Sequence, residues 1–236
     1  MWTGDVAAVV LAYLLGSVPF SHLIARWRAG LDIRQVGEGN VGARNVWHVV
    51  GPAWGVLAAV LDIGKGLGAV VLGRLLGASE VGALLVGPAV ILGHAFPLFL
   101  RFRGGKGVAT LVGVLLAWAP WSTLAGLAVF GVAQFFLRDF NRSVVFGFLA
   151  AILLPPAFGY PWTLGLYALV LSCLLAVKKW LDLAHERQVW ARAGWKGEAR
   201  PGWYRQEGLP REVAGEVHEG EAVEGDPEDA PVAGPM

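Results

Sequence analysis

Long uncharged apolar stretches alternate with short polar segments along the first 198 residues, and this alternation predicts membrane-spanning helices. Several of the stretches supply the roughly 20 apolar residues that a helix needs to cross a bilayer. The expected spans cover residues 6–26, 52–75 and 81–100, two segments within 108–136, and two more that flank 155–161. The sequence therefore predicts an all-α, polytopic integral membrane protein with seven transmembrane helices.

The segment 108–136 is too long for one straight crossing and contains a break. Pro120 lacks a backbone donor, and Trp118 and Trp121 belong to a residue type that gathers at membrane interfaces. We therefore divide this segment into two spans. An alternative with five spans, in which 108–136 is a single or re-entrant segment, stays open at this point.

Basic residues occur in every second loop, which predicts the orientation in the membrane. Because cytoplasmic loops carry an excess of Lys and Arg, the N-terminus is expected outside and the C-terminus in the cytoplasm. The basic loops are 26–48, 101–106, 138–142 and 178–179, whereas the turns at 78–80, 118–121 and 155–161 contain no Lys or Arg.

Composition supports a membrane domain and separates it from a polar tail. The chain is 56% hydrophobic and only 16% charged, whereas soluble domains average about 25% charged residues. Residues 199–236 hold nine acidic and three basic residues among many Pro and Gly. Such a segment cannot bury enough apolar surface to offset its ordering entropy. We expect a membrane domain over 1–198 and a disordered, non-catalytic tail over 199–236.

The stretch from Gly93 to Thr110 is the strongest candidate for a ligand site. It leaves an apolar run and then combines basic residues with glycines that permit positive φ and uncover backbone N–H groups. Cations beside exposed amides suit a phosphate group presented at a membrane surface. The alternative is a cytoplasmic turn whose cations only fix the topology. The cations are Arg101, Arg103 and Lys106, and the glycines are Gly104, Gly105 and Gly107.

Other patterns are weaker or misleading. Residues 37–42 spell G-x-G-x-x-G, but a dinucleotide site needs a βαβ unit, and membrane spans flank this segment. Its glycines are still expected to form an anion-accessible loop. Asp62 and Lys65 lie one helical turn apart inside a span, where ionisable groups are usually functional; the alternative is that they only neutralise each other. No Cys/His cluster indicates a metal site.

Five segments together resemble the bacterial acyl-phosphate:glycerol-3-phosphate 1-acyltransferase family, PlsY. Residues 16–20 (GSVPF) look like the family's GSIPF, and 32–37 (DIRQVG) like its DIREVG. Residues 39–43 with Asn45 resemble GNIGATN, and 61–66 resemble LDxxKG. The fifth segment, 93–110, is similar to GHxFPxFLxFxGGKGVAT at nearly every position. The similarity covers about residues 5–198.

The resemblance implies an enzyme of the bacterial inner membrane whose active site lies at the cytoplasmic face. The family transfers an acyl chain from acyl phosphate to the 1-hydroxyl of sn-glycerol 3-phosphate, releasing lysophosphatidic acid and phosphate. No cofactor, metal or nucleic-acid partner is expected. Two alternatives stay open: a divergent non-catalytic relative that binds lipid phosphates or a partner, and a small transporter, which should contain an inverted repeat.

The resemblance also implies which residues form the site. Lys106 and His185 are the expected catalytic residues, and the proton acceptor is either His185 or a phosphate of the substrate. Asp62 and Lys65 are expected to support the site. The expected substrate contacts are Ser17, Gly39, Asn40, Gly42, Arg44, Asn45, His48, His94, Arg103, Gly104, Gly105, Gly107, Arg142 and Gln188.

Five positions depart from the family's pattern. The family has Ser, Thr and usually Arg where this chain has Glu38, Arg44 and His48. We expect Arg44 to neutralise Glu38 and to replace the cation missing one helical turn later. Val145 and Gln188 stand where the family has Ser and Asn. Valine cannot donate to a phosphate oxygen, and a lost charge-assisted hydrogen bond costs about 1.5–3 kcal/mol.

Overall fold

The computed structural model describes residues 2–193, and every regular element in this range is helical. The expected tail at 199–236, and the last residues of the 1–198 domain, lie outside the described residues. The elements are α1 (Trp2–Gly16), α2 (Phe20–Ala29), α3 (Ala43–Val49), α4 (Pro52–Leu75), α5 (Glu80–Ala95), η1 (Leu98–Leu100), α6 (Val108–Trp118), α7 (Pro120–Leu137), α8 (Phe140–Leu153), η2 (Pro155–Phe158) and α9 (Trp162–Ala193).

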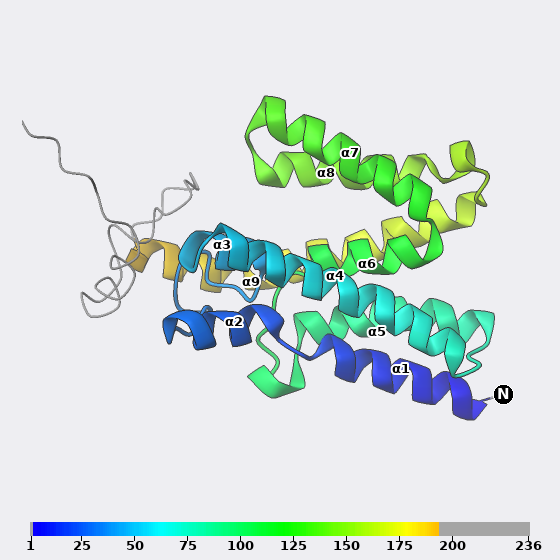
Figure 1. The fold of residues 1–236 in the computed structure, drawn as a ribbon, viewed down its shortest axis with the longest axis horizontal. Helices are drawn as coiled ribbons and strands as arrows, with labels where there is room; N and C mark the ends of the chain where they lie inside the picture. Colours follow the sequence, from blue (N-terminus) through cyan, green and yellow to red (C-terminus); the bar gives the residue numbers. More distant parts are fainter. Residues whose placement is uncertain (1, 194–236) are drawn as a thin grey trace, which may run out of the picture.

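The helices lie roughly along one direction, and the chain runs back and forth between two ends (Figure 1). The N-terminus and the connections α4–α5, α6–α7 and α8–α9 lie at one end. The loop between α2 and α3, the connection α7–α8 and the end of α9 lie at the other, which we call the polar end. The helices α7 and α8 pair as a hairpin beside the rest of the bundle.

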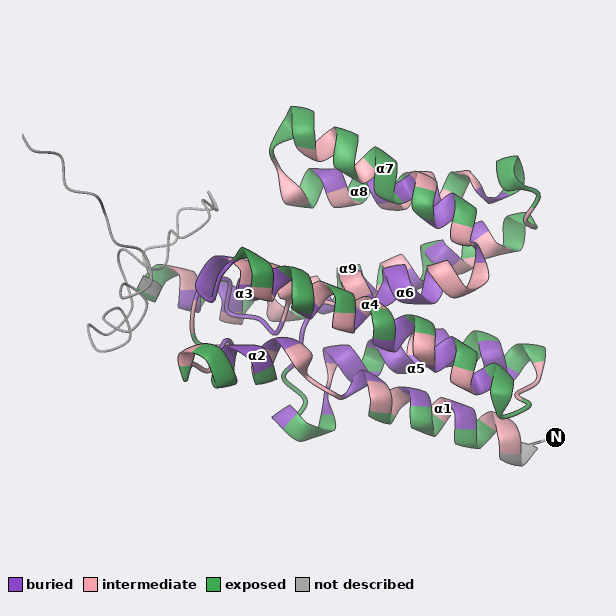
Figure 2. Ribbon diagram, viewed as in Figure 1, coloured by how far each residue is buried: buried purple, intermediate pink, exposed green. Residues whose placement is uncertain are grey.

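Five helical segments in the described range are long and apolar enough to cross a membrane. The segments α6 and α8 are apolar but shorter, with 11 and 14 residues, so α6 extends over only about 16 Å. Large apolar side chains are exposed on the outer helix surfaces, such as Phe135 at 76% and Leu153 at 72%, and Figure 2 shows exposed positions along the whole length of α7 and α8. Such a surface suits lipid rather than water.

Helix starts follow the local chemistry of the sequence. Pro52 and Pro120 occupy the first turns of α4 and α7, where the missing N–H costs nothing. The break at 118–121 is thereby confirmed, since α6 ends at Trp118.

At the N-terminal end of the molecule, the Asp5 carboxylate accepts hydrogen bonds from the Ser79 N–H (2.7 Å) and hydroxyl (3.0 Å). This contact ties α1 to the start of α5.

The first expected span, 6–26, is not one continuous helix. It breaks at residues 17–19 into α1 and α2, because Pro19 has no N–H to continue the hydrogen-bond ladder. In this break the carbonyl oxygen of Val18 accepts hydrogen bonds from the Phe20 N–H at 3.2 Å and from Lys65 Nζ at 3.0 Å. The break thus provides a partner for a buried lysine. The third expected span, 81–100, is likewise made of two elements, because α5 ends at Ala95 and the short η1 turn follows, although Glu80–Leu100 together is long and apolar enough to cross.

Glycines allow α4 and α6 to touch through their backbones. A Cβ atom at Gly66 would overlap the carbonyl oxygen of Thr110, and one at Gly113 would overlap that of Ile63. Small residues permit such close helix approach in membranes. The same device joins α1 to α5 at Gly16 and Gly93. These contacts bring the start of α6 beside the charged pair of α4.

We predict that Gly66→Ala destabilises the protein, whereas Gly64→Ala does not. The two glycines lie two residues apart in α4, but only the Cβ at position 66 meets backbone; nothing lies within 4 Å of one at position 64. Overpacking of this kind costs about 1–3 kcal/mol. The midpoint of thermal unfolding in detergent should fall for Gly66→Ala alone. Equal midpoints for both variants would contradict direct backbone contact between α4 and α6.

Candidate active site

The glycines of the loop 101–107 allow close packing against the end of α5 and a positive φ at the start of α6. The Gly104 N–H donates to the Ala95 carbonyl oxygen (3.2 Å) and the Gly105 N–H to that of His94 (3.1 Å). A Cβ at Gly105 would overlap the His94 ring and the Val41 carbonyl oxygen. The expectation that these amides are uncovered for a ligand is therefore wrong for Gly104 and Gly105, because the end of α5 already uses them. Gly107 has φ +90° where the chain enters α6.

The basic residues of this loop point in different directions. Arg101 and Arg103 are exposed, whereas the Lys106 side chain is only 21% exposed and its Nζ lies 2.9 Å from Glu186 Oε1. Burial lowers the pKa of Lys106 from its usual 10.5, although the carboxylates of Glu186 and Glu38 oppose that shift. Lys106 is thus the cation that the loop directs into the molecule, and Arg103 is not brought to it.

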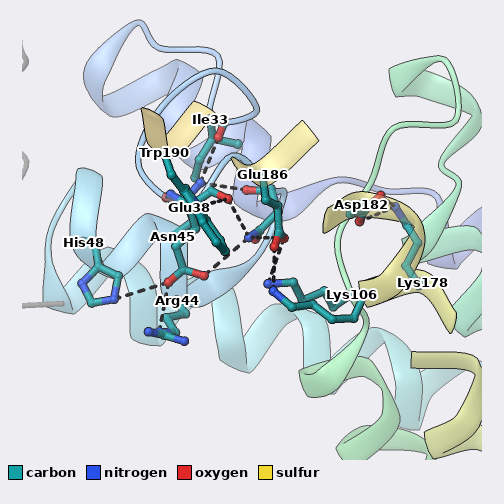
Figure 3. A network of polar contacts seen from close by, with 12 residues as sticks. Ile33, Glu38, Arg44, Asn45, His48, Lys106, Lys178, Asp182, Glu186 and Trp190 are labelled. Carbon is teal, nitrogen blue, oxygen red and sulfur yellow. Dashed lines mark hydrogen bonds and ion pairs between the residues drawn. The ribbon is translucent and has the colours of Figure 1, made fainter. Parts of the chain in front are cut away.

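Glu186 of α9 organises the charges around Lys106 (Figure 3). Its side chain is fully buried. One carboxylate oxygen contacts Lys106 and accepts from Asn40 Nδ2 at 3.2 Å, while the other accepts from Lys179 Nζ at 2.6 Å. Neither Glu186 nor Lys179 was expected from the sequence to belong to the site. Their spacing of seven residues, which places both on one helix face, was the available signal.

The loop that precedes α3 is held together by the side chain of Asn45. Its Nδ2 donates to the carbonyl oxygens of Ile33 (2.9 Å), Val36 (3.1 Å) and Asn40 (2.9 Å), and its Oδ1 accepts from the Glu38 N–H (2.9 Å). The side chain is fully buried. Asn45 therefore shapes the loop from within, where its amide is already used.

Helix α9 covers this loop from the other side. The side chain of Val189 lies 3.0 Å from where a Cβ of Gly39 would stand, and Gly39 has φ +71°. Trp190 Nε1 donates to the Glu38 carbonyl oxygen at 3.2 Å. A larger residue at position 39 would push α9 away. Gly42 has extended backbone at the start of α3.

Glu38 is neutralised as the sequence predicted. Arg44 Nε lies 2.9 Å and His48 Nε2 3.5 Å from Glu38 Oε1, and Asn40 Nδ2 lies 3.4 Å from Oε2. Burial lowers the pKa of His48 below its usual 6.5 although Glu38 opposes the shift, so His48 is mainly neutral at pH 7. The Arg44 guanidinium also stacks over Phe140 at 4.7 Å, which links α3 to the start of α8.

A second polar cluster lies beneath the glycine-rich loop. Lys65 Nζ is 2.9 Å from Asp62 Oδ1, His94 Nδ1 is 3.6 Å from the same oxygen, and the Ser21 hydroxyl donates to Asp62 at 3.5 Å. Because His94 backs directly on Gly105, this cluster supports the loop. The ion pair shows that Asp62 and Lys65 neutralise each other, and their supporting role in the site stays a prediction.

Several expected contacts stay outside the Lys106 network. Ser17 is buried and its hydroxyl donates to the Tyr13 carbonyl oxygen of its own helix. Arg142 is 76% exposed and pairs with Asp139, and Val145 and Gln188 are exposed.

His185 faces the backbone rather than Lys106. Its Nε2 lies 3.0 Å from the Arg34 carbonyl oxygen, so that nitrogen carries the hydrogen, because a carbonyl oxygen only accepts. Arg34 itself is held by Asp32 at 2.6 Å. Hydrogen bonds from Arg34 keep the pKa of Asp32 below its usual range. Only Nδ1 of His185 is left for exchanging a proton.

The arrangement suits an anionic ligand. The side chains of Lys106, Lys179 and Arg44 converge on a region where two buried carboxylates neutralise them. Within residues 2–193 no group of three His, Cys, Asp or Glu side chains could hold a metal ion.

Comparison with known proteins finds relatives of this chain. The family model described as glycerol-3-phosphate acyltransferase matches residues 6–188. The glycerol-3-phosphate acyltransferase of Desulforudis audaxviator is 41% identical over 177 residues, covering 74% of this chain and 87% of that protein. That of Jannaschia sp. is 46% identical over 164 residues, covering 70% of this chain and 77% of that protein.

A solved structure shares the fold. The crystal structure of PlsY (YgiH), an integral membrane glycerol 3-phosphate acyltransferase, in its glycerol 3-phosphate form matches with a TM-score of 0.70 and 31% identity, over 84% of this chain and 94% of that one. Its lysophosphatidic acid form matches with a TM-score of 0.67. The motif resemblance is confirmed, and this all-α, multi-pass integral membrane chain belongs to the PlsY glycerol-3-phosphate acyltransferase family.

Proposed function

We propose that this protein transfers an acyl group from acyl phosphate to the 1-hydroxyl of sn-glycerol 3-phosphate, giving lysophosphatidic acid and phosphate. Family membership over residues 6–188 supports the acceptor and the product. The observation that carries the proposal is Lys106, which faces inward at the end of a glycine-rich loop, with Lys179 on the other oxygen of its partner Glu186. Both proposed substrates are phosphates, and a buried cationic site favours them.

The reaction needs orientation and charge stabilisation more than a dedicated nucleophile. The acceptor hydroxyl oxygen attacks the acyl carbon, an ester bond forms, and the bond to phosphate breaks. Lys106 stabilises the charge that gathers on the departing phosphate. Two proton acceptors stay open: a phosphate oxygen of the substrate, and Nδ1 of His185, since Nε2 of that ring donates to the Arg34 carbonyl oxygen.

Wild-type protein should release phosphate from palmitoyl phosphate only when glycerol 3-phosphate is present. The experiment uses the full chain, purified in lipid, and identifies lysophosphatidic acid as the organic product. A folded protein that binds acyl phosphate without turnover would instead be the non-catalytic relative. The buried carboxylates that already occupy the cations are the observation favouring this second candidate.

Replacing Lys106 should abolish turnover. The Lys106→Ala variant loses the charge that faces the departing phosphate, and loss of one such contact costs about 100-fold or more in rate. Arg187→Gln is the matched control, because Arg187 is an exposed cation on α9 directly after Glu186. Full turnover by Lys106→Ala would remove the central assignment.

The lowered pKa of Lys106 predicts an alkaline limit to substrate binding. Phosphate binds the protonated lysine, and a lowered pKa means that the proton leaves at a pH below the usual 10.5. The profile of kcat/KM for glycerol 3-phosphate against pH, which reports the free enzyme, should therefore fall before that pH. Lys106→Arg keeps its charge and should shift the alkaline limb of the profile to higher pH. An unchanged limb in this variant would assign the titration to another group.

The proposed topology has seven spans, with the N-terminus outside and the site and C-terminus at the cytoplasmic face of the bacterial inner membrane. The alternation of chain direction in Figure 1 and the distribution of basic loops support it. In this arrangement the short helices α6 and α8 also cross, embedded among longer neighbours.

Cysteine labelling distinguishes seven spans from five. Cys173, the single cysteine of the chain, is first replaced by Ala. In the proposed topology, a cysteine at Glu80 reacts with an impermeant maleimide in intact cells, whereas one at Asn141 reacts only after permeabilisation. If α6 and α8 did not cross, α7 would reverse direction and Asn141 would label from outside.

A further inference from the structure

One face of α9 carries a set of charged and aromatic residues directed at Lys106. Lys179, Glu186 and Trp190 lie at spacings of seven and four residues, so they share that face. The Glu186 carboxylate bridges two ammonium groups, with Lys106 on one oxygen at 2.9 Å and Lys179 on the other at 2.6 Å. A phosphate group held by two lysines would make the same kind of contacts, through two of its oxygens.

We propose that Lys179 is a second phosphate-binding lysine and that Glu186 is a resident counter-ion, which the phosphate of the substrate displaces from both lysines. Glu186 then sets how tightly phosphate binds, and Lys179 contributes to that binding together with Lys106. This inference rests on the proposed function, since it concerns the same site.

The exposure of the three side chains fits displacement. Glu186 is fully buried, whereas the side chains of Lys106 and Lys179 are 21% and 38% exposed. A phosphate that arrives from the aqueous side therefore meets the two ammonium groups before it meets the carboxylate. The carboxylate that bridges the two lysines also holds them close together while no substrate is bound.

Lys179 is held in place more firmly than an ordinary surface lysine. Its Nζ lies 5.4 Å from the centre of the Trp190 ring, as in a cation–π contact. Trp190 is in turn fixed by the hydrogen bond from Nε1 to the Glu38 carbonyl oxygen at 3.2 Å. These contacts restrict the lysine before a ligand arrives, which reduces the entropy lost on binding.

The Glu186 carboxylate lies close to a second carboxylate, that of Glu38. Asn40 Nδ2 lies 3.2 Å from Glu186 Oε1 and 3.4 Å from Glu38 Oε2, so two carboxylates share one amide group. Like charges close to one amide group repel each other in a buried setting. Repulsion from Glu38 therefore lowers the cost of releasing Glu186 from the two lysines.

The test measures binding of inorganic phosphate to the full chain in detergent, through the rise in thermal midpoint with phosphate concentration at constant ionic strength. Glu186→Gln keeps the shape and removes the competing charge, so its apparent affinity for phosphate should rise about tenfold. Lys179→Gln should lower the affinity by a similar factor. Asp182→Asn is the matched control, because it removes a carboxylate from the same helix that pairs with Lys178 instead; its affinity should equal that of wild type.

Unchanged or weaker phosphate binding by Glu186→Gln would overturn the counter-ion role, and unchanged binding by Lys179→Gln would overturn the second-lysine assignment. Should Glu186→Gln not yield folded protein, Lys179→Gln decides alone, since its partly exposed side chain is replaceable without a cavity.

Turnover measurements separate this inference from the proposed function. With glycerol 3-phosphate, Glu186→Gln should lower KM and Lys179→Gln should raise it, each with a smaller change in kcat. An ion pair with only a structural role would change the thermal midpoint without phosphate and leave KM unaltered, which would also overturn the inference. If wild type shows no acyl transfer but the phosphate affinities shift as expected, the proposed reaction fails and the anion exchange stands.

Discussion

The contact on which the polar end depends is the buried carboxylate of Glu186 between two lysines. It joins three segments that are distant in the sequence: α9, the loop that carries Lys106, and the loop before α3 through Asn40. Breaking a buried ion pair by removing one partner strands the remaining charge, at a cost of about 3–5 kcal/mol. The same contact therefore closes the fold at this end and brings the cations of the site together.

Beneath this contact, two charged residues lie inside a membrane-spanning helix, where a charge is costly unless it is paired. Asp62 and Lys65 lie within α4 and are almost fully buried, where ionised groups are costly. At the break beside Pro19 the Val18 carbonyl oxygen accepts from Lys65, and α5 places His94 beside Asp62. These two contacts are local, yet they support the packing of His94 against Gly105 and thereby the position of the loop above.

The sequence predicted the helical architecture well because long apolar runs have few alternatives in a membrane. It also located the Lys106 loop and the neutralisation of Glu38 by Arg44, since both depend on residues close together in the chain. It did not predict the use of the Gly104 and Gly105 amides by α5, or the role of Glu186. Those features depend on how α5, α6 and α9 pack, and hydropathy cannot distinguish a buried carboxylate on the charged end of α9 from a solvated one. The positions of Ser17 and Arg142, away from Lys106, also depend on helix packing and could not be predicted from hydropathy.

The pair formed by Glu38 and Arg44 is unequal. Glu38 is nearly buried, whereas Arg44 is partly exposed and also stacks on Phe140. Without Glu38, the arginine would keep its contact with water and with the ring. Without Arg44, the glutamate would be buried beside a mainly neutral histidine. The carboxylate therefore depends on the guanidinium more than the guanidinium depends on the carboxylate.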